Sequence, residues 1–307
     1  RHFSHGGYYP VGGSSQIATR LLKTVADNDG WTRICADVEE ILIEKNKAVG
    51  VRLKGGEELR ATQVISAAGV LPTLTRLLPD SVRQQEWVDS ITSNLRPSPA
   101  HICLNIGFKG DIRTAGCSSA NKWFWSVWSM DEREWDFDLE EIDTCPLLYC
   151  SFPSLKDPKH DPGPENKHTG EVVTFVPYET FQKWEDTPWR RRGEDYDQLK
   201  KRLKEAILEQ FLSHMPELRD MVDYVELSTP LSTTYFNRAA KGAIYGIEPT
   251  PERFQNPWLR PKSPIKGLYL SGSDVASVGV IGAMMGGVLC AAAAAPTKAL
   301  PFLKKML

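Results

Sequence analysis

The sequence lacks the short motifs that mark nucleotide-hydrolysing and acyl-transferring enzymes. Its 307 residues contain neither a GxxxxGK[ST] phosphate-binding loop nor a GxSxG nucleophile turn, so nothing indicates an NTPase or an α/β-hydrolase. The six cysteines show neither CxxC nor paired cysteine–histidine spacing, which predicts reduced thiols without a disulfide framework. None of the six histidines has ligand spacing to another metal-binding residue, and we expect no metal.

An excess of charge of one sign is also missing. The chain has 37 Lys and Arg residues against 39 Asp and Glu residues, a net charge of −2. Because nucleic-acid binding leaves a basic footprint, we expect no nucleic-acid partner. Residues 1–16 lack the apolar run of a secretory signal, which predicts a protein that is cytoplasmic or peripheral on the cytoplasmic face of a membrane. The oligomeric state stays open.

The patterns that are present indicate a mixed α/β fold. Residues 195–215 carry apolar side chains at every fourth position with charged residues between them, which predicts an amphipathic helix. Residues 36–69 form short apolar runs broken at Asn46 and at Gly55–Gly56, which predicts a meander of strands that ends in a buried strand.

The segment with the most chemical content is 267–295. It reads as a buried strand, a small-residue turn, an acid and a glycine-rich helix start. Gly272 permits close approach of a ligand to the backbone, and Asp274 can accept hydrogen bonds from ribityl or ribose hydroxyls. Free amides at 279–282 would face an open cavity and favour an anion, either a pyrophosphate or the electron-rich side of a reduced flavin. Alternatively, the uncharged stretch 275–295 has the length of a membrane span.

This segment resembles the carboxyl-terminal flavin signature of the amine-oxidase-like flavoproteins, particularly the phytoene desaturases, carotenoid isomerases and retinol saturases. In those families a strand, an acid and a G-x-x-G-A helix start embrace the flavin. The matching positions are Asp274, Gly279, Ile281, Gly282 and Ala283. The resemblance extends over residues 10–21, 36–69 and 222–254, and it is greatest to retinol saturases at 152–158, 175–186 and 229–246.

The resemblance implies further contacts to FAD. In those families the meander matching 36–69 lies against the adenosine end of the cofactor, so Val38 would touch the adenine. Ala67, Ala68 and Gly69 would lie at the ADP moiety. The spacing alone is equally consistent with a three-stranded element that is purely structural and has no cofactor contact. The expected cofactor residues are Val38, Ala67, Ala68, Gly69, Gly272, Asp274, Gly279, Ile281, Gly282 and Ala283.

The fold that the resemblance implies is a two-domain flavoprotein of the FAD/NAD(P)-binding type. Residues 17–80 and 255–307 would belong to the FAD domain, and residues 1–16 and 84–250 to a substrate domain of mixed sheet and helices. The families open with a GxGxxG motif that holds the FAD pyrophosphate, and this chain has none. We therefore expect that the amino-terminal dinucleotide βαβ unit is missing and that the chain alone binds FAD poorly, with an exposed apolar face where that unit belongs.

The implied function is that of an FAD-dependent oxidoreductase acting on C=C or CH–CH bonds of an apolar polyene or isoprenoid. Saturation, desaturation and isomerisation all stay open. No catalytic residue is identified, although Tyr235 and Tyr245 lie in a segment similar to retinol saturases and would suit either proton donation or structural hydrogen bonding. Alternatives are a non-catalytic protein that binds a hydrophobic ligand or a membrane surface, and an amine oxidase of the same superfamily.

An aromatic cluster leaves a related choice open. Three alternatives stay open for its side chains: they line a tunnel for a polyene, they make peripheral contact with a membrane surface, or they belong to the core. The cluster consists of Trp123, Phe124, Trp125, Trp128, Trp135 and Phe137.

Overall fold

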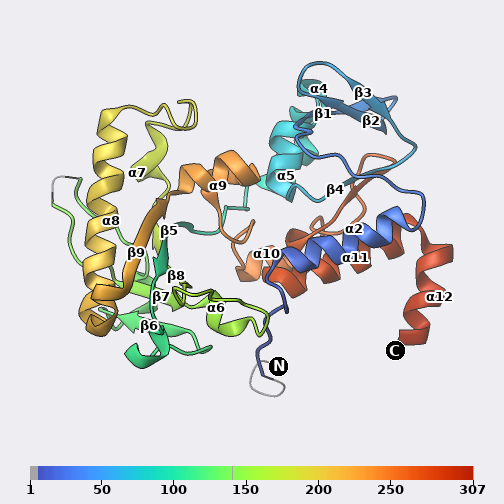
Figure 1. Ribbon diagram of the computed structural model, residues 1–307. Helices are drawn as coiled ribbons and strands as arrows, with labels where there is room; N and C mark the ends of the chain where they lie inside the picture. Colours follow the sequence, from blue (N-terminus) through green and yellow to red (C-terminus); the bar gives the residue numbers. More distant parts are fainter. Residues whose placement is uncertain (1–5, 140, 307) are drawn as a thin grey trace. The chain divides into compact units, whose positions relative to one another are not determined.

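The computed structural model describes residues 6–139 and 141–306. Contacts divide the chain into two compact units, one of Arg1–Ile34 with His101–Leu231 and the other of Cys35–Ala100 with Ser232–Leu307. Each unit combines helices with strands (Figure 1), so the expected mixed α/β class is confirmed.

The contact division differs from the expected domain ranges at their edges. Residues 17–34 group with the first unit, and residues 84–100 and 232–250 group with the second. Residues 1–5 and 307, which the expected ranges include, lie outside the described residues. The assignment of the FAD and substrate roles to the two units stays a prediction.

The first unit is built on a five-stranded sheet of order β6-β7-β8-β5-β9. A long helix, α8 (Glu194–His214), buries Leu199, Leu203, Ile207 and Phe211, which are the apolar positions that the four-residue spacing predicts. The ring of His214 at the end of α8 stacks on Phe124 of β6 at 4.3 Å between centroids. The strands are β5 (Ala100–Phe108), β6 (Lys122–Trp125), β7 (Leu147–Ser151), β8 (His168–Val176) and β9 (Val222–Ser228).

Shorter helical elements complete this unit. They are α2 (Ser15–Ala26), η2 (Ile112–Ala115), η3 (Met130–Glu132), α6 (Pro153–Lys156), α7 (Glu179–Gln182) and η4 (Pro216–Met221). Helix α9 (Pro230–Asn237) crosses along the chain from the first unit into the second.

The second unit contains the predicted meander. Strands β1 (Val38–Glu44), β2 (Lys47–Leu53) and β3 (Glu58–Arg60) pair antiparallel in that order. The chain then enters β4 (Val64–Ser66), which pairs in parallel with β10 (Leu268–Leu270) from the far end of the sequence. This long-range pairing brings the two segments with the expected cofactor residues together.

Helices surround these strands and share one apolar core with them. Buried members of this core include Ile41, Leu74, Leu78, Ile91, Ile265 and Leu268. The helical elements are α3 (Val70–Pro72), η1 (Thr73–Leu77), α4 (Asp80–Arg83), α5 (Glu86–Thr92), η5 (Ala240–Gly242), α10 (Pro251–Gln255), η6 (Ser273–Val275), α11 (Gly279–Ala294) and α12 (Pro296–Met306).

Helix α11 occupies the uncharged stretch for which a membrane span was the alternative. Within the described chain, no single helix has both the length and the apolar character needed to cross a membrane. Only α11 and α12 taken as a pair satisfy these criteria, and the pair is sharply bent at the break between them.

Candidate functional site

Two parallel strands end side by side in the second unit. Leu270 of β10 lies opposite Ser66 of β4, and the amide of Ser271 donates to the carbonyl of Ser66 at 2.9 Å. The chain turns after each strand, at 67–69 and at 271–274. In open α/β sheets, ligands bind outside the carboxyl ends of parallel strands, so these neighbouring turns are the expected place for a site.

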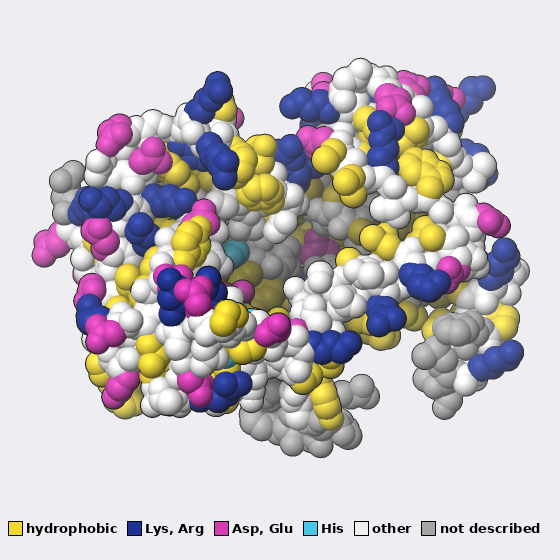
Figure 2. Space-filling model, in the orientation of Figure 1, with side chains coloured by type: hydrophobic (Ala, Val, Ile, Leu, Met, Phe, Trp, Pro, Cys, Tyr) yellow, Lys and Arg dark blue, Asp and Glu magenta, His cyan; other side chains and the backbone are white. Residues whose placement is uncertain are grey.

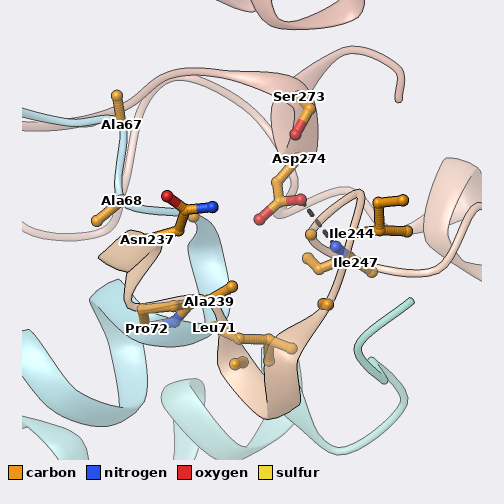
Figure 3. A pocket seen from close by; sticks show the side chains of 14 residues that line it. Ala67, Ala68, Leu71, Pro72, Asn237, Ala239, Ile244, Ile247, Ser273 and Asp274 are labelled. Atoms are coloured by element: carbon orange, nitrogen blue, oxygen red, sulfur yellow. Dashed lines mark hydrogen bonds between the residues drawn. The ribbon is translucent and has the colours of Figure 1, made fainter. Parts of the chain in front are cut away.

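A pocket of about 210 Å³ opens beside these turns (Figure 3). Complete small-molecule sites occupy roughly 300–1,000 Å³, so this pocket has room for part of a larger ligand. Small side chains dominate its walls, which lets a ligand approach the backbone. The lining residues are Ala67, Ala68, Gly69, Leu71, Pro72, Asn237, Ala239, Ala240, Ala243, Ile244, Gly246, Ile247, Ser273 and Asp274.

Asp274 joins three segments at this pocket. Its side chain is buried, and its Oδ2 accepts from the Val70 amide at 2.8 Å while its Oδ1 accepts from the Ile247 amide at 3.0 Å. Figure 3 shows the Ile247 contact as a dashed line. Gly246 has φ +72° and a Cβ there would lie 2.4 Å from Asp274 Oδ1. The close approach of this loop to the carboxylate therefore requires glycine.

Arg253 stabilises the same wall from behind. It is only 2% exposed, and its guanidinium donates to the carbonyl of Ser273 at 2.6 Å and also to the carbonyl of Ile247. Burial lowers the pKa of Arg253, and the Asp274 carboxylate opposes this shift. Asp274 and Arg253 therefore both link the loop at Ile247 to the turn at 273–274, which holds this wall of the pocket together.

Asn237 supplies a polar group that is free to meet a ligand. Figure 3 shows its carboxamide beside the pocket, on the side that faces Asp274. Its side chain has no hydrogen-bond partner within the described chain, so both of its donors and its acceptor are available. The sequence reasoning missed Asn237 and the lining residues near it. Their only signal was membership of the 229–246 segment.

Four expected cofactor residues meet in this pocket. Ala67, Ala68 and Gly69 line it from the turn after β4, and Asp274 lines it from η6. The two carboxylate oxygens of Asp274 are directed to backbone amides. This side chain therefore has a structural task in addition to the expected contact with ligand hydroxyls.

The start of α11 contains four other expected residues, none of which lines the pocket. The helix begins at Gly279 as predicted, and a Cβ at Gly279 would meet nothing within 4 Å. Ile281 is 72% exposed. A Cβ at Gly282 would instead lie 1.7 Å from the carbonyl oxygen of Ser277. On its Cβ side, Gly282 therefore packs the helix against the preceding turn, and the expectation that Gly282 contacts the cofactor stays a prediction.

Gly272 has a similar packing role. A Cβ at Gly286, one turn further along α11, would lie 2.0 Å from the carbonyl oxygen of Gly272. The backbone of Gly272 therefore contacts the helix directly. Ala283, the remaining expected residue of this helix, is exposed.

Val38 lies apart from these residues, in a second pocket of about 460 Å³ in the same unit. Charged side chains surround it, including Arg76, Arg83 and the ion pair of Asp37 with Arg238 at 2.7 Å. The expected contact between Val38 and an adenine stays a prediction.

The other chemical candidates do not extend the site. Tyr235 and Tyr245 are 40% and 44% exposed, and their proposed proton transfer stays untested. Among the described residues, no three His, Cys, Asp or Glu side chains gather as metal ligands. Figure 2 shows both signs of charge on the visible face of each unit, in keeping with the balanced composition.

Comparison with known proteins identifies relatives over nearly the whole chain. The family model for flavin containing amine oxidoreductase matches residues 2–295. All-trans-retinol 13,14-reductase of Danio rerio is 33% identical over 94% of this chain and 49% of its own length. The human enzyme of that name is 32% identical over 95% of this chain and 50% of its own length. Phytoene desaturase of Cereibacter sphaeroides is 28% identical over 87% of this chain and 50% of its own length.

Solved structures agree on the fold. An oxidoreductase from Methanosarcina mazei superposes with a TM-score of 0.58 at 18% identity, covering 90% of this chain and 53% of that one. A putrescine oxidase variant gives a TM-score of 0.56 at 12% identity, covering 94% and 53%. The expected flavoprotein fold is therefore confirmed. The chain spans about half the length of the curated relatives it matches.

Proposed function

The chain belongs to the flavin containing amine oxidoreductase family, and from this membership we propose that the complete protein is an FAD-dependent oxidoreductase acting on carbon–carbon bonds of an apolar polyene or isoprenoid. The observation that carries the proposal is the extent of its similarity to enzymes named for polyene substrates, over 94% of the chain for the first. The relatives named as retinol reductases reach 33% identity, whereas the desaturase reaches 28%. This difference favours reduction of a double bond over desaturation.

The pocket beside β4 and β10 fits part of a flavin dinucleotide. Half of its lining residues are alanine or glycine, which allows a cofactor to contact the backbone. Asn237 would bind a polar group of the cofactor, and the Ala67–Ala68–Gly69 turn would lie against its ADP moiety. Asp274 and Arg253 would hold these segments in place. FAD, when bound, supplies the transfer of hydride to or from the substrate carbon.

The amino-terminal end of α11 at Gly279 would stabilise negative charge on the cofactor. The first amides of α11 have no partners within the helix, and its dipole places partial positive charge there. Negative charge that develops on a reduced flavin near this end would be stabilised by about 1 kcal/mol. A Cβ at Gly279 would meet nothing within 4 Å, which leaves room for such an approach.

A non-catalytic binding protein is the second candidate, and one relative favours it. A Danio rerio protein named inactive all-trans-retinol 13,14-reductase is 30% identical over 94% of this chain. Similarity at this level therefore accompanies both active and inactive proteins. Peripheral contact with a membrane, from which an apolar substrate would come, stays a prediction as well.

Visible spectroscopy of the purified complete protein tests this proposal. We expect a flavin absorption band which, after chemical reduction of the flavin without oxygen, returns when a retinoid is added, whereas a simple amine should not bleach the band of the oxidised protein. A protein without bound flavin would instead support the binding protein. Bleaching by an amine but not by a retinoid would assign the amine oxidase activity.

A further inference from the structure

One continuous segment of the chain, residues 237–247, forms half of the lining of the pocket beside β4 and β10. Its far end, at Ile247, is held by hydrogen bonds to the buried side chains of Asp274 and Arg253. Its near end carries Asn237, whose carboxamide lies beside the pocket in Figure 3. Whatever holds the near end therefore determines where this carboxamide lies.

Burial does not hold the near end. Helix α9 ends at Asn237, and its buried side chains, Pro230 and Leu231, both belong to its first turn. Asn237 and the following Arg238 are exposed. An exposed helix end frays readily unless a further contact fixes it. The segment therefore needs an anchor outside its own helix.

Arg238 has a backbone conformation that is unusual for an arginine. Its amide donates to the carbonyl of Thr234 at 3.0 Å, which closes the last turn of α9, and its φ is 55°. Helices often end on a residue in this left-handed region, but it is usually glycine because a Cβ is strained there. Lys241, with φ 47°, is a second such residue in the segment. Strained residues persist only where the surrounding structure holds them, and they gather at functional sites.

Asp37 supplies the contact that holds Arg238. The guanidinium lies 2.7 Å from the Asp37 carboxylate. Asp37 directly precedes β1, and its carbonyl accepts from the Lys54 amide at 2.8 Å, which continues the pairing of β1 with β2. The anchor is therefore the end of a sheet. Both side chains are partly exposed, at 45% and 35%, so the ion pair contributes little to stability. Its main effect is on the direction in which the chain leaves α9.

A purely local role for Arg238 makes a different prediction. A cation at the carboxyl end of a helix interacts favourably with the helix dipole, and the guanidinium also lies 5.7 Å from the ring of Tyr235 in the last turn of α9. If Arg238 only closed the helix, glycine would serve at least as well, because glycine adopts a φ of 55° without strain. If Arg238 anchors the segment, glycine would keep the turn and lose the anchor.

We propose that Arg238 is a positioning residue: its ion pair with Asp37 holds Asn237 against the bound cofactor, so that Arg238 acts on cofactor affinity through Asn237. The proposal rests on the proposed function, because it takes the pocket beside β4 and β10 as part of the flavin site. A contact on the meander thus fixes a polar group in the pocket at the carboxyl ends of β4 and β10.

Binding of FAD to the complete protein, stripped of its flavin beforehand, tests the proposal. Affinity is followed by the fluorescence of the flavin, and stability by the urea midpoint of unfolding. Arg238→Gly should weaken FAD binding by about three- to tenfold, the factor that one hydrogen bond between neutral groups represents. Its urea midpoint should stay at the wild-type value or rise, since relief of the left-handed strain offsets the loss of a partly exposed ion pair.

Variants of the ion pair separate its effect from that of the glycine. Asp37→Asn leaves Arg238 in place and should weaken FAD binding by a similar factor. Arg238→Lys, which keeps the cation, should retain part of the affinity that Arg238→Gly loses. Lys45→Gly is the matched control, because Lys45 lies in the same unit with φ 49° and lines neither pocket. It should leave the FAD affinity unchanged.

A double variant tests whether Arg238 acts through Asn237. Asn237→Ala should weaken FAD binding by at least as much as Arg238→Gly, and Arg238→Gly should have no further effect when added to Asn237→Ala. Deuterium uptake of the flavin-free protein provides a readout without cofactor. Arg238→Gly should speed exchange of the amides in 237–243, whereas Lys45→Gly should not.

Three results would overturn the proposal. Wild-type affinity for FAD in a folded Arg238→Gly or Asp37→Asn protein, or wild-type deuterium uptake at 237–243 in Arg238→Gly, would show that the ion pair does not hold the segment. Additive losses in the double variant would show that Arg238 does not act through Asn237. If Arg238→Gly does not fold, Asp37→Asn alone decides. A wild-type protein that binds no FAD refutes the proposed function, whereas FAD binding that is insensitive to both variants refutes only the role of Arg238.

Discussion

Replacement of Asp274 by alanine should lower the free energy of unfolding of the second unit. We expect this loss of stability to be the primary effect, with any change in chemistry following from it. The carboxylate is 4% exposed and accepts hydrogen bonds from the backbone amides of Val70 and Ile247, at 2.8 and 3.0 Å. Alanine removes both acceptors at once. The two amides lose their partners in a buried place, and the nearby Arg253 guanidinium loses the carboxylate that balances its charge.

The magnitude follows from these contacts. A hydrogen bond to a charged group contributes about 1.5–3 kcal/mol, so loss of two should lower the free energy of unfolding by about 3–6 kcal/mol. Domains are stable by only about 5–15 kcal/mol. Asp274→Asn keeps one acceptor oxygen and places an amide NH₂ against the other backbone amide, so it should cost roughly half as much.

The assay is urea unfolding of the complete protein followed by circular dichroism, with hydrogen exchange at the amides of Val70 and Ile247. Asp89→Ala is the matched control, because Asp89 is an exposed residue of the same unit. Surface substitutions of this kind change stability by about 0.5 kcal/mol or less. A folded Asp274→Ala protein with a wild-type urea midpoint and wild-type protection at both amides would refute the claim that Asp274 stabilises this unit.

Three further predictions address other parts of the chain. Gly286→Ala should destabilise α11, because its Cβ would lie 2.0 Å from the carbonyl oxygen of Gly272. Gly287→Ala has open space around it and should increase the free energy of unfolding by up to about 1 kcal/mol, which would be measured as a higher thermal midpoint. Burial lowers the pKa of His168. The unfolded chain therefore takes up a proton first, and the urea midpoint should fall as pH drops below about 6.5, less so in His168→Asn. Cys35 alone among the cysteines is exposed, so thiol titration with a chromogenic disulfide should show one fast thiol that Cys35→Ser removes; several fast thiols would contradict the packing.

Local patterns predicted much of the fold. The apolar spacing of 195–215 gave the buried face of α8, and turn residues marked the breaks of the meander. The start of α11 at Gly279 followed from its small residues. These features depend on residues that are near one another in the sequence, so a sequence pattern can reveal them.

The details of the site depended on contacts that no local pattern contains. Asp274 binds the amide of Val70, which lies 204 residues away, and the sequence could only indicate that an acid follows a strand. Gly282 looked like a glycine left open for a cofactor, yet it lies against the carbonyl of Ser277. A small residue permits a ligand or the protein's own backbone to approach, and only the fold decides between them.

The central claim is that the complete protein uses FAD to change a carbon–carbon bond of a polyene, and one anaerobic experiment tests it most directly. The protein, with its flavin chemically reduced beforehand, is mixed with all-trans-retinol while flavin absorption and the polyene spectrum are followed together. We predict that the flavin is reoxidised as the polyene loses one conjugated double bond, in equal amounts. A flavin that stays reduced in the presence of an unchanged polyene would contradict the account.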